Sequence, residues 1–176
     1  MNVDDILTDI IQKEGGFVSH PRDGGGPTCY GITIGTLSQY YGRKATIDEV
    51  KNLSIETAKE IYSREYYYKP MFHTIPELIQ PIVVDTGVLF GPVRATKFMQ
   101  SICNQANFGI ISEDGVLGNL SRAAIANAVN AMDVFFINAM VEERILAHKI
   151  RVQERPDQEV FLAGWINRAE SFRVQV

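Results

Sequence analysis

The sequence contains few of the residues that build metal sites or disulfide frameworks. Its 176 residues include two cysteines, three histidines and one tryptophan. Cys29 and Cys103 lie far apart in the chain and in no metal-ligand spacing, which argues against a zinc site. We expect both cysteines to be reduced, partly buried thiols.

Long apolar runs and a basic excess are also missing. No stretch reaches transmembrane length, and the opening residues "MNVDDILTDIIQKEGG" carry acids where a signal peptide has basic residues. The net charge of -4 argues against electrostatic binding of nucleic acid. We therefore expect cytoplasmic synthesis without a signal peptide, no membrane insertion and no nucleic-acid partner.

The spacing of apolar residues predicts an all-α fold. Apolar side chains recur every three or four residues from Val3 to Ile11, and Gly15 and Gly16 are natural stops for that helix. Strand patterns are confined to residues 17–33, where a small β-hairpin is expected. The other expected helices cover residues 34–41, a short segment opened by a capping box from Thr46 to Glu49, 55–68, 76–89, 92–106, 121–131, 134–153 and 157–171. The break "FGP" predicts two lobes, residues 1–91 and 92–176.

The loop "EGGFVSHPRDGGGPTCYGIT", residues 14–33, contains the candidate catalytic residues. Cleavage of a glycosidic bond needs a protonated acid and usually a second carboxylate. Glu14, at the inner end of an apolar helix face, suits a general acid, and Asp23 among turn residues suits an ionised base. The alternative is structural, because a glutamate at a helix end can be solvated and Asp-Gly-Gly-Gly can be only a turn.

This loop resembles the signature of glycoside hydrolase family 108, small phage and prophage lysozymes with an EGG motif. Four further features are similar to the same family: "AKEIYSREYYYKP", the spacing from Asp85 to Gly91 with Ala95 and Gln100 beyond, "EDGVLG" and "FLAGWINR". The resemblance implies a mainly helical lysozyme-like fold, a muramidase activity without cofactor and Glu14 as the general acid. The sequence departs from the family pattern shortly before Gly91, where Leu89 and Phe90 stand in place of an expected asparagine.

The resemblance implies cleavage of the β-1,4 bond between N-acetylmuramic acid and N-acetylglucosamine. Asp23, helped by Thr28, would hold or deprotonate the attacking water. The spacing also resembles that of T-even phage lysozymes, in which eight residues separate the Glu from the Asp and five separate the Asp from a Thr. In this sequence the same spacing ends on Cys29, and Thr28 lies one position earlier. Either Thr28 or Cys29 would therefore meet the water. A lytic transglycosylase and a non-catalytic wall-binding protein are the alternative functions.

Five residues are the candidates for substrate contact: Gly25, Gly26, Tyr30, Tyr67 and Asp85. The glycines would let the backbone approach the glycan closely. Tyrosine rings suit stacking on sugars, although packing in the core explains any single one of Tyr66, Tyr67 and Tyr68 at least as well. Asp85 is equally well explained as a buried helix acid that satisfies neighbouring groups.

The resemblance also implies the partners of the protein. They are the glycan strands of peptidoglycan, reached after release through a holin-type pore, with a predicted peptidoglycan-binding region in residues 92–176. The alternative for "EDGVLG" is an ordinary turn before a helix, and Trp165 fits a core position better than a sugar platform. The sequence leaves the oligomeric state open.

Overall fold

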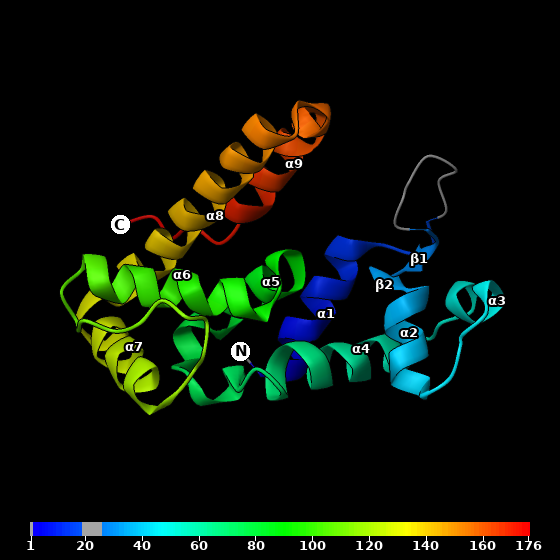
Figure 1. The fold of residues 1–176 in the computed structure, drawn as a ribbon, viewed down its shortest axis with the longest axis horizontal. Helices are drawn as coiled ribbons and strands as arrows, with labels where there is room; N and C mark the ends of the chain where they lie inside the picture. The colour runs from blue at the N-terminus through cyan, green and yellow to red at the C-terminus, as the bar shows by residue number, and fades with distance from the viewer. Residues whose placement is uncertain (1, 19–25) are drawn as a thin grey trace. The chain divides into compact units, whose positions relative to one another are not determined.

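The chain forms an all-α fold with one small hairpin, as the sequence predicts. It is described here from a computed structural model that covers residues 2–18 and 26–176 (Figure 1). Contacts divide it into two compact units, Met1–Lys69 and Pro70–Val176. Each unit has its own buried residues and is described by itself.

The first unit packs a small hairpin and short helices around the first helix. α1 packs against α4 through Ile6, Leu7, Ile10 and Ile11, which are all buried. This is the apolar face that the spacing predicted. The elements of the unit are α1 (Val3–Glu14), β1 (Thr28–Cys29), β2 (Ile32–Thr33), α2 (Ile34–Tyr41), α3 (Ile47–Lys51), α4 (Ile55–Tyr62) and the π-helical turn η1 (Ser63–Tyr68).

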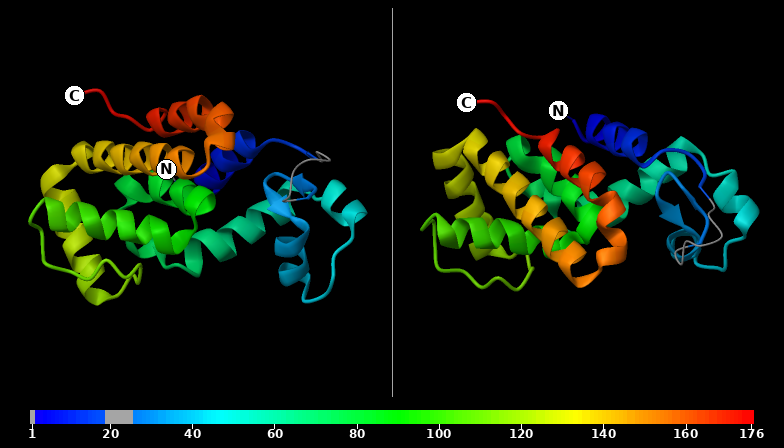
Figure 2. Two further views of the ribbon diagram at one scale, coloured as in Figure 1. Left: turned by 45° about the horizontal axis from the view of Figure 1, so that its top comes forward. Right: turned by 90° about the horizontal axis from the view of Figure 1, so that it is seen from above.

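The second unit is a helical bundle. In both views of Figure 2, α8 and α9 run side by side, and α5 and α6 also pack together. Its elements are η2 (Phe72–Thr74), η3 (Glu77–Ile79), α5 (Gln80–Phe90), α6 (Pro92–Gln105), α7 (Asn119–Met132), α8 (Val134–Glu154), η4 (Pro156–Gln158) and α9 (Glu159–Glu170).

The helix boundaries agree with the sequence signals where a local cap exists. Thr46 and Glu49 form the predicted capping box at the start of α3, with hydrogen bonds of 3.2 Å and 2.8 Å. The helix expected over 55–68 changes its hydrogen-bond pattern at Ser63, from α to π. The amide of Lys69 accordingly donates to the carbonyl of Arg64 at 3.0 Å, one residue further back than in an α-helix.

The lobe boundary that the sequence predicts lies inside the second unit. The break at 91 and 92 separates α5 from α6, which pack against each other, whereas the compact units divide between Lys69 and Pro70. A break between two helices in sequence leaves them free to pack together in space. The assignment of catalysis to 1–91 and of wall binding to 92–176 stays a prediction about function.

A buried charge network joins three helices of the second unit. Asp85 on α5 and Arg144 on α8 are completely buried and joined at 2.8 Å, and Arg168 on α9 meets the same carboxylate at 2.9 Å. One turn beyond Arg144, His148 stacks on Trp165 with ring centroids 4.9 Å apart. Burial, together with nearby arginines, lowers the pKa of His148 to about 4, so the imidazole is neutral at pH 7.

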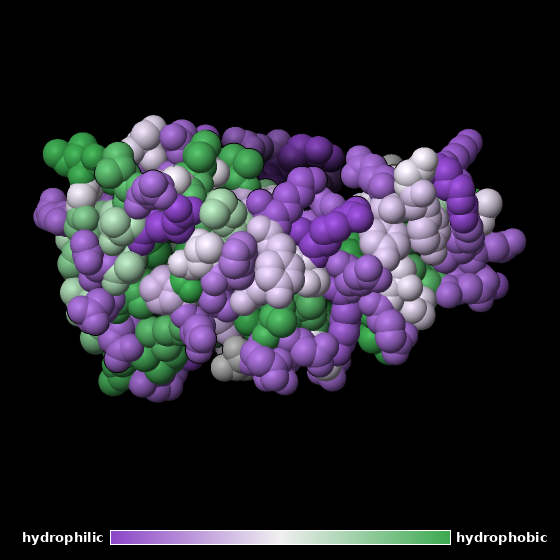
Figure 3. Space-filling view, turned by 90° about the horizontal axis from the view of Figure 1, so that it is seen from below, coloured by the Kyte–Doolittle hydropathy of each residue, from purple (hydrophilic) through white to green (hydrophobic). Residues whose placement is uncertain are grey.

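The surface is mixed. On the face drawn in Figure 3, hydrophilic residues predominate and apolar residues form separate patches. Among the described residues, no single helix is long and apolar enough to cross a membrane. α7 and α8 meet the criteria of length and composition only as a pair, which is bent by 113°.

Candidate active site

Glu14 is the last residue of α1, as the sequence predicts. It follows the buried pair Ile10 and Ile11, and the helix ends at Gly15, whose amide donates to the carbonyl of Ile11 at 3.1 Å. The side chain of Glu14 is half-buried. A carboxyl group in this position lies at the edge of the core and stays accessible from outside, so a substrate can come within hydrogen-bond reach of it.

The hairpin brings its turn directly against Glu14. β1 and β2 pair antiparallel, with Thr28 opposite Thr33 and Cys29 opposite Ile32. The two residues of the turn, Tyr30 and Gly31, both have positive φ angles, 52° and 74°. Positive φ at both central residues is the geometry of a type I′ turn, one of the two turns favoured in two-residue hairpins.

Gly31 leaves room for two functional oxygen atoms. A Cβ atom at this position would lie 2.7 Å from Oε2 of Glu14 and 2.6 Å from the hydroxyl oxygen of Tyr62. Both distances are far shorter than a carbon atom tolerates, so a side chain here would have to displace the carboxylate or the hydroxyl group. The acid, the turn and Tyr62 therefore form one close-packed group, and this group is the candidate active site.

We expect Gly31→Ala to lower the peptidoglycan cleavage that the resemblance implies by about 100-fold, the effect of displacing a reacting group by about 1 Å. The added methyl group must push the carboxylate of Glu14 or the hydroxyl of Tyr62 away. Left-handed backbone at an alanine also lowers stability by roughly 1–2 kcal/mol. The measurements are the turnover of purified sacculi and the thermal midpoint.

Gly42→Ala is the matched control for this variant. Gly42 has a similar φ of 65°, but within the described part of the chain nothing lies within 4 Å of its added Cβ. We expect it to lose a comparable amount of stability and to retain the activity. Equal activities of the two variants would show that the contacts around Gly31 do not matter to the reaction.

Two tyrosines beside Glu14 were not among the predicted site residues. Tyr62 is buried, and its hydroxyl donates to the carbonyl of Tyr30 at 2.7 Å. The ring of Tyr66 lies 5.5 Å from that of Tyr62. The pKa of Tyr66 is raised by burial and, to a smaller extent, by the negative charges of Glu65 and Glu14. The signal in the sequence was the motif "AKEIYSREYYYKP", which contains both residues but does not show that they meet the loop.

The burial of Tyr67 does not support its predicted contact with substrate. Its side chain is 8% exposed and its ring meets the edge of Tyr68 with centroids 5.0 Å apart. Tyr68 is 52% exposed. The run of three tyrosines therefore does reach the surface, as expected, but through Tyr68, because the register of η1 turns Tyr67 inward.

The hairpin separates the two residues proposed to meet the water. Side chains alternate along a strand, so Thr28 and Cys29 point to opposite faces. Cys29 is 4% exposed, and burial raises the pKa of its thiol. Thr28 is half-buried. Exposure therefore favours Thr28, whose role in catalysis stays a prediction.

Four other predicted residues lie in the same loop. Asp23 and Gly25 fall outside the described residues, so their predicted roles stay predictions. Gly26 is described, and among the residues that the structure describes nothing lies within 4 Å of the position of a Cβ atom there. Its predicted contact with the glycan stays a prediction. The predicted substrate contact of Tyr30 also stays a prediction; its side chain is half-buried.

The surroundings of Asp85 fit its alternative role as a buried helix acid that satisfies neighbouring groups. Its carboxylate is 0% exposed, and both oxygens accept hydrogen bonds from Arg168 or Arg144. A carboxylate enclosed by two guanidinium groups offers no open edge to a sugar hydroxyl. The buried network explains this acid without a substrate.

The motif "EDGVLG" forms a turn that is held by hydrogen bonds to a buried side chain of the second unit. Completely buried Gln100 donates hydrogen bonds to Asp114, Val116 and Ser121 and accepts one from the amide of Gly115. The carboxylate of Asp114 accepts a hydrogen bond from the amide of Val116 at 2.8 Å. These contacts account for the turn in structural terms.

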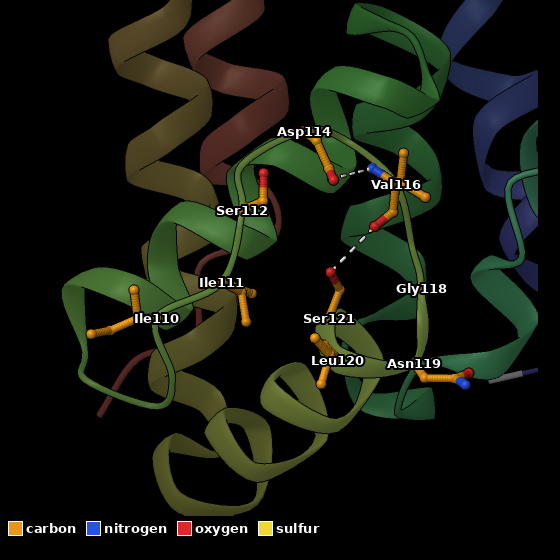
Figure 4. Close-up of a pocket in the computed structure, with 9 residues that line it drawn as sticks. All are labelled: Ile110, Ile111, Ser112, Asp114, Val116, Gly118, Asn119, Leu120 and Ser121. Atoms are coloured by element: carbon orange, nitrogen blue, oxygen red, sulfur yellow. Dashed lines mark hydrogen bonds between the residues drawn. The ribbon is translucent and has the colours of Figure 1, made fainter.

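A cavity of about 300 Å³ lies beside this turn (Figure 4). Figure 4 shows that its lining comes from the loop before α7 and from the first turn of that helix. Binding of the wall in this region stays a prediction. The lining residues are Ile110, Ile111, Ser112, Asp114, Val116, Gly118, Asn119, Leu120 and Ser121.

The cysteines are buried thiols in separate units. Cys29 lies in β1 and Cys103 in α6, and neither forms a disulfide. Burial raises the pKa of Cys103 to about 11. Within residues 2–18 and 26–176, no group of three histidine, cysteine, aspartate or glutamate side chains is arranged to hold a metal ion.

Comparisons with known proteins place this chain in a family. The family profile "Glycosyl hydrolase 108" matches residues 7–91, which include Glu14, the hairpin and both tyrosines. A solved structure, "Structure of Brucella abortus SagA", is 30% identical with a TM-score of 0.79, and the match covers 97% of this chain and 91% of that one. The comparison with curated proteins gave no match. The chain belongs to the glycosyl hydrolase 108 family.

Proposed function

We propose that the protein is an N-acetylmuramidase that hydrolyses the β-1,4 bond between N-acetylmuramic acid and N-acetylglucosamine. Membership of the glycosyl hydrolase 108 family supports a lysozyme-like peptidoglycan hydrolase. The observation that carries the proposal is the packing of the Glu14 carboxylate against the turn at Gly31. A carboxyl group held in one place beside a loop can meet a glycosidic oxygen in a fixed geometry.

Glu14 is the general acid of this proposal. Its protonated carboxyl group would donate a proton to the leaving oxygen, and positive charge would develop at the anomeric carbon. Asp23, which follows nine residues later, would hold or deprotonate a water molecule on the opposite face of the sugar, with Thr28 as a further hydrogen-bonding group. If the carboxyl groups of Glu14 and Asp23 stand roughly 6.5–9.5 Å apart, the reaction inverts the anomeric carbon, and a separation near ~5 Å favours retention.

Product analysis tests the reaction type. We expect purified sacculi digested in ¹⁸O-water to yield glycan fragments with reducing N-acetylmuramic ends that carry one ¹⁸O atom. The label enters because water attacks the anomeric carbon. Mass spectrometry that finds unlabelled 1,6-anhydromuramic ends would instead establish a lytic transglycosylase, which uses the hydroxyl group of the substrate in place of water.

The same assay tests the non-catalytic alternative. A wall-binding protein would sediment with sacculi and release no fragments. If fragments do appear, NMR of the first products distinguishes the two hydrolytic mechanisms, because the anomeric configuration at the new end is either inverted or retained.

A further inference from the structure

Tyr62 connects the hairpin turn to the proposed acid. It is the last residue of α4 and 2% exposed, and its ring packs against Tyr66. Its hydroxyl holds the carbonyl of Tyr30 at 2.7 Å. We propose that Tyr62 is a positioning residue that fixes the Tyr30–Gly31 turn against the carboxylate of Glu14. This inference rests on the proposed role of Glu14.

The oxygen atoms of Tyr62 and Glu14 converge on one point. The position of a Cβ atom at residue 31 lies 2.6 Å from the hydroxyl oxygen and 2.7 Å from Oε2 of the carboxylate. Only the hydrogen atom of a glycine fits between these groups. Any movement of the turn relative to α4 therefore changes the space around the carboxylate.

The turn requires such an anchor because its own conformation is unfavourable. Tyr30 has a left-handed backbone without being a glycine, which is disfavoured because its Cβ atom crowds the backbone. The strands on either side contribute only two residues each, so the hairpin has a short ladder. The hydrogen bond from Tyr62 to the carbonyl of Tyr30 helps to offset the strain of the turn.

Tyr62→Phe tests the hydroxyl alone, because phenylalanine keeps the buried ring. We expect kcat on peptidoglycan to fall by about 10- to 100-fold, the effect of a small displacement of a reacting group, with KM changed less than about twofold. Tyr41→Phe is the matched control, since this ring belongs to the same unit and is 39% exposed. A kcat equal to that of the wild type would overturn the inference.

A double-mutant cycle separates positioning from a general loss of stability. Gly31→Ala already displaces the turn, so we expect Tyr62→Phe to cause little further loss of kcat in that background. Losses that multiply would show that the hydroxyl acts independently of the turn. Glu14→Gln separates the failure of the proposed function from the failure of the role of Tyr62. Full activity of Glu14→Gln would contradict the proposed function. An inactive Glu14→Gln together with a fully active Tyr62→Phe would contradict only the role of Tyr62.

Discussion

Replacement of Glu14 with glutamine is expected to lower the rate of peptidoglycan cleavage by about 10²- to 10⁴-fold, the usual contribution of a general acid. Glutamine has nearly the same shape as glutamate and preserves the packing against Gly31, but its amide cannot give a proton to the leaving oxygen. Because the side chain is only half-buried, the fold should be retained. The measurements are the clearing of sacculi at matched protein concentration and the thermal midpoint.

Glu56→Gln is the control for this substitution. Glu56 lies in the first turn of α4 and is exposed, so its variant loses the same charge away from the candidate site. We expect the control to clear sacculi at the rate of the wild type. If Glu14→Gln also cleared at that rate, the general acid would have to be another residue.

Asp85→Asn is expected to have the largest effect on stability, a loss of about 3–5 kcal/mol in the free energy of unfolding. The neutral amide leaves the guanidinium group of Arg144 buried without a counter-charge. Arg168 is less affected, because 15% of its side chain is exposed and water can solvate it. Urea unfolding of the full chain measures the loss, and the single tryptophan, Trp165, reports on the second unit by fluorescence.

The exposed pair of Arg155 and Asp157 supplies the control for Asp85. Both partners are more than half exposed, so Asp157→Asn should change stability by less than about 1 kcal/mol. Kinetics on the folded fraction also test the alternative role of Asp85. A raised KM with unchanged stability would return Asp85 to the substrate contacts and contradict the structural role.

Much of the fold could be predicted because helix signals are local. The apolar spacing in α1, the glycine after Glu14 and the capping box at Thr46 each depend on residues within a few positions of one another. The hairpin could be predicted for the same reason, since its turn lies between two short strands. The switch to π-helix after Tyr62 could not, because the residues there are compatible with either hydrogen-bond pattern.

The surroundings of the predicted substrate residues could not be read from the sequence, because they depend on burial, and the substrate contacts themselves stay predictions. Tyr67 and Asp85 are residue types that bind sugars, but a ring or a carboxylate binds only where it is open. The register of η1 buries Tyr67, and two arginines more than fifty residues away in sequence enclose Asp85. Nothing near either residue in the sequence indicates these contacts.

Local signals in the sequence were enough to predict the helical fold, the acid at the end of α1 and the loop that follows, because each depends on neighbouring residues. Which side chains meet that acid depends on how the helices pack in space. Tyr62 lies 48 positions after Glu14 in the sequence. Its hydroxyl meets the turn next to the carboxylate because α1 and α4 pack through their apolar faces. Packing between helices joins distant residues, and spacing along the chain does not record which ones.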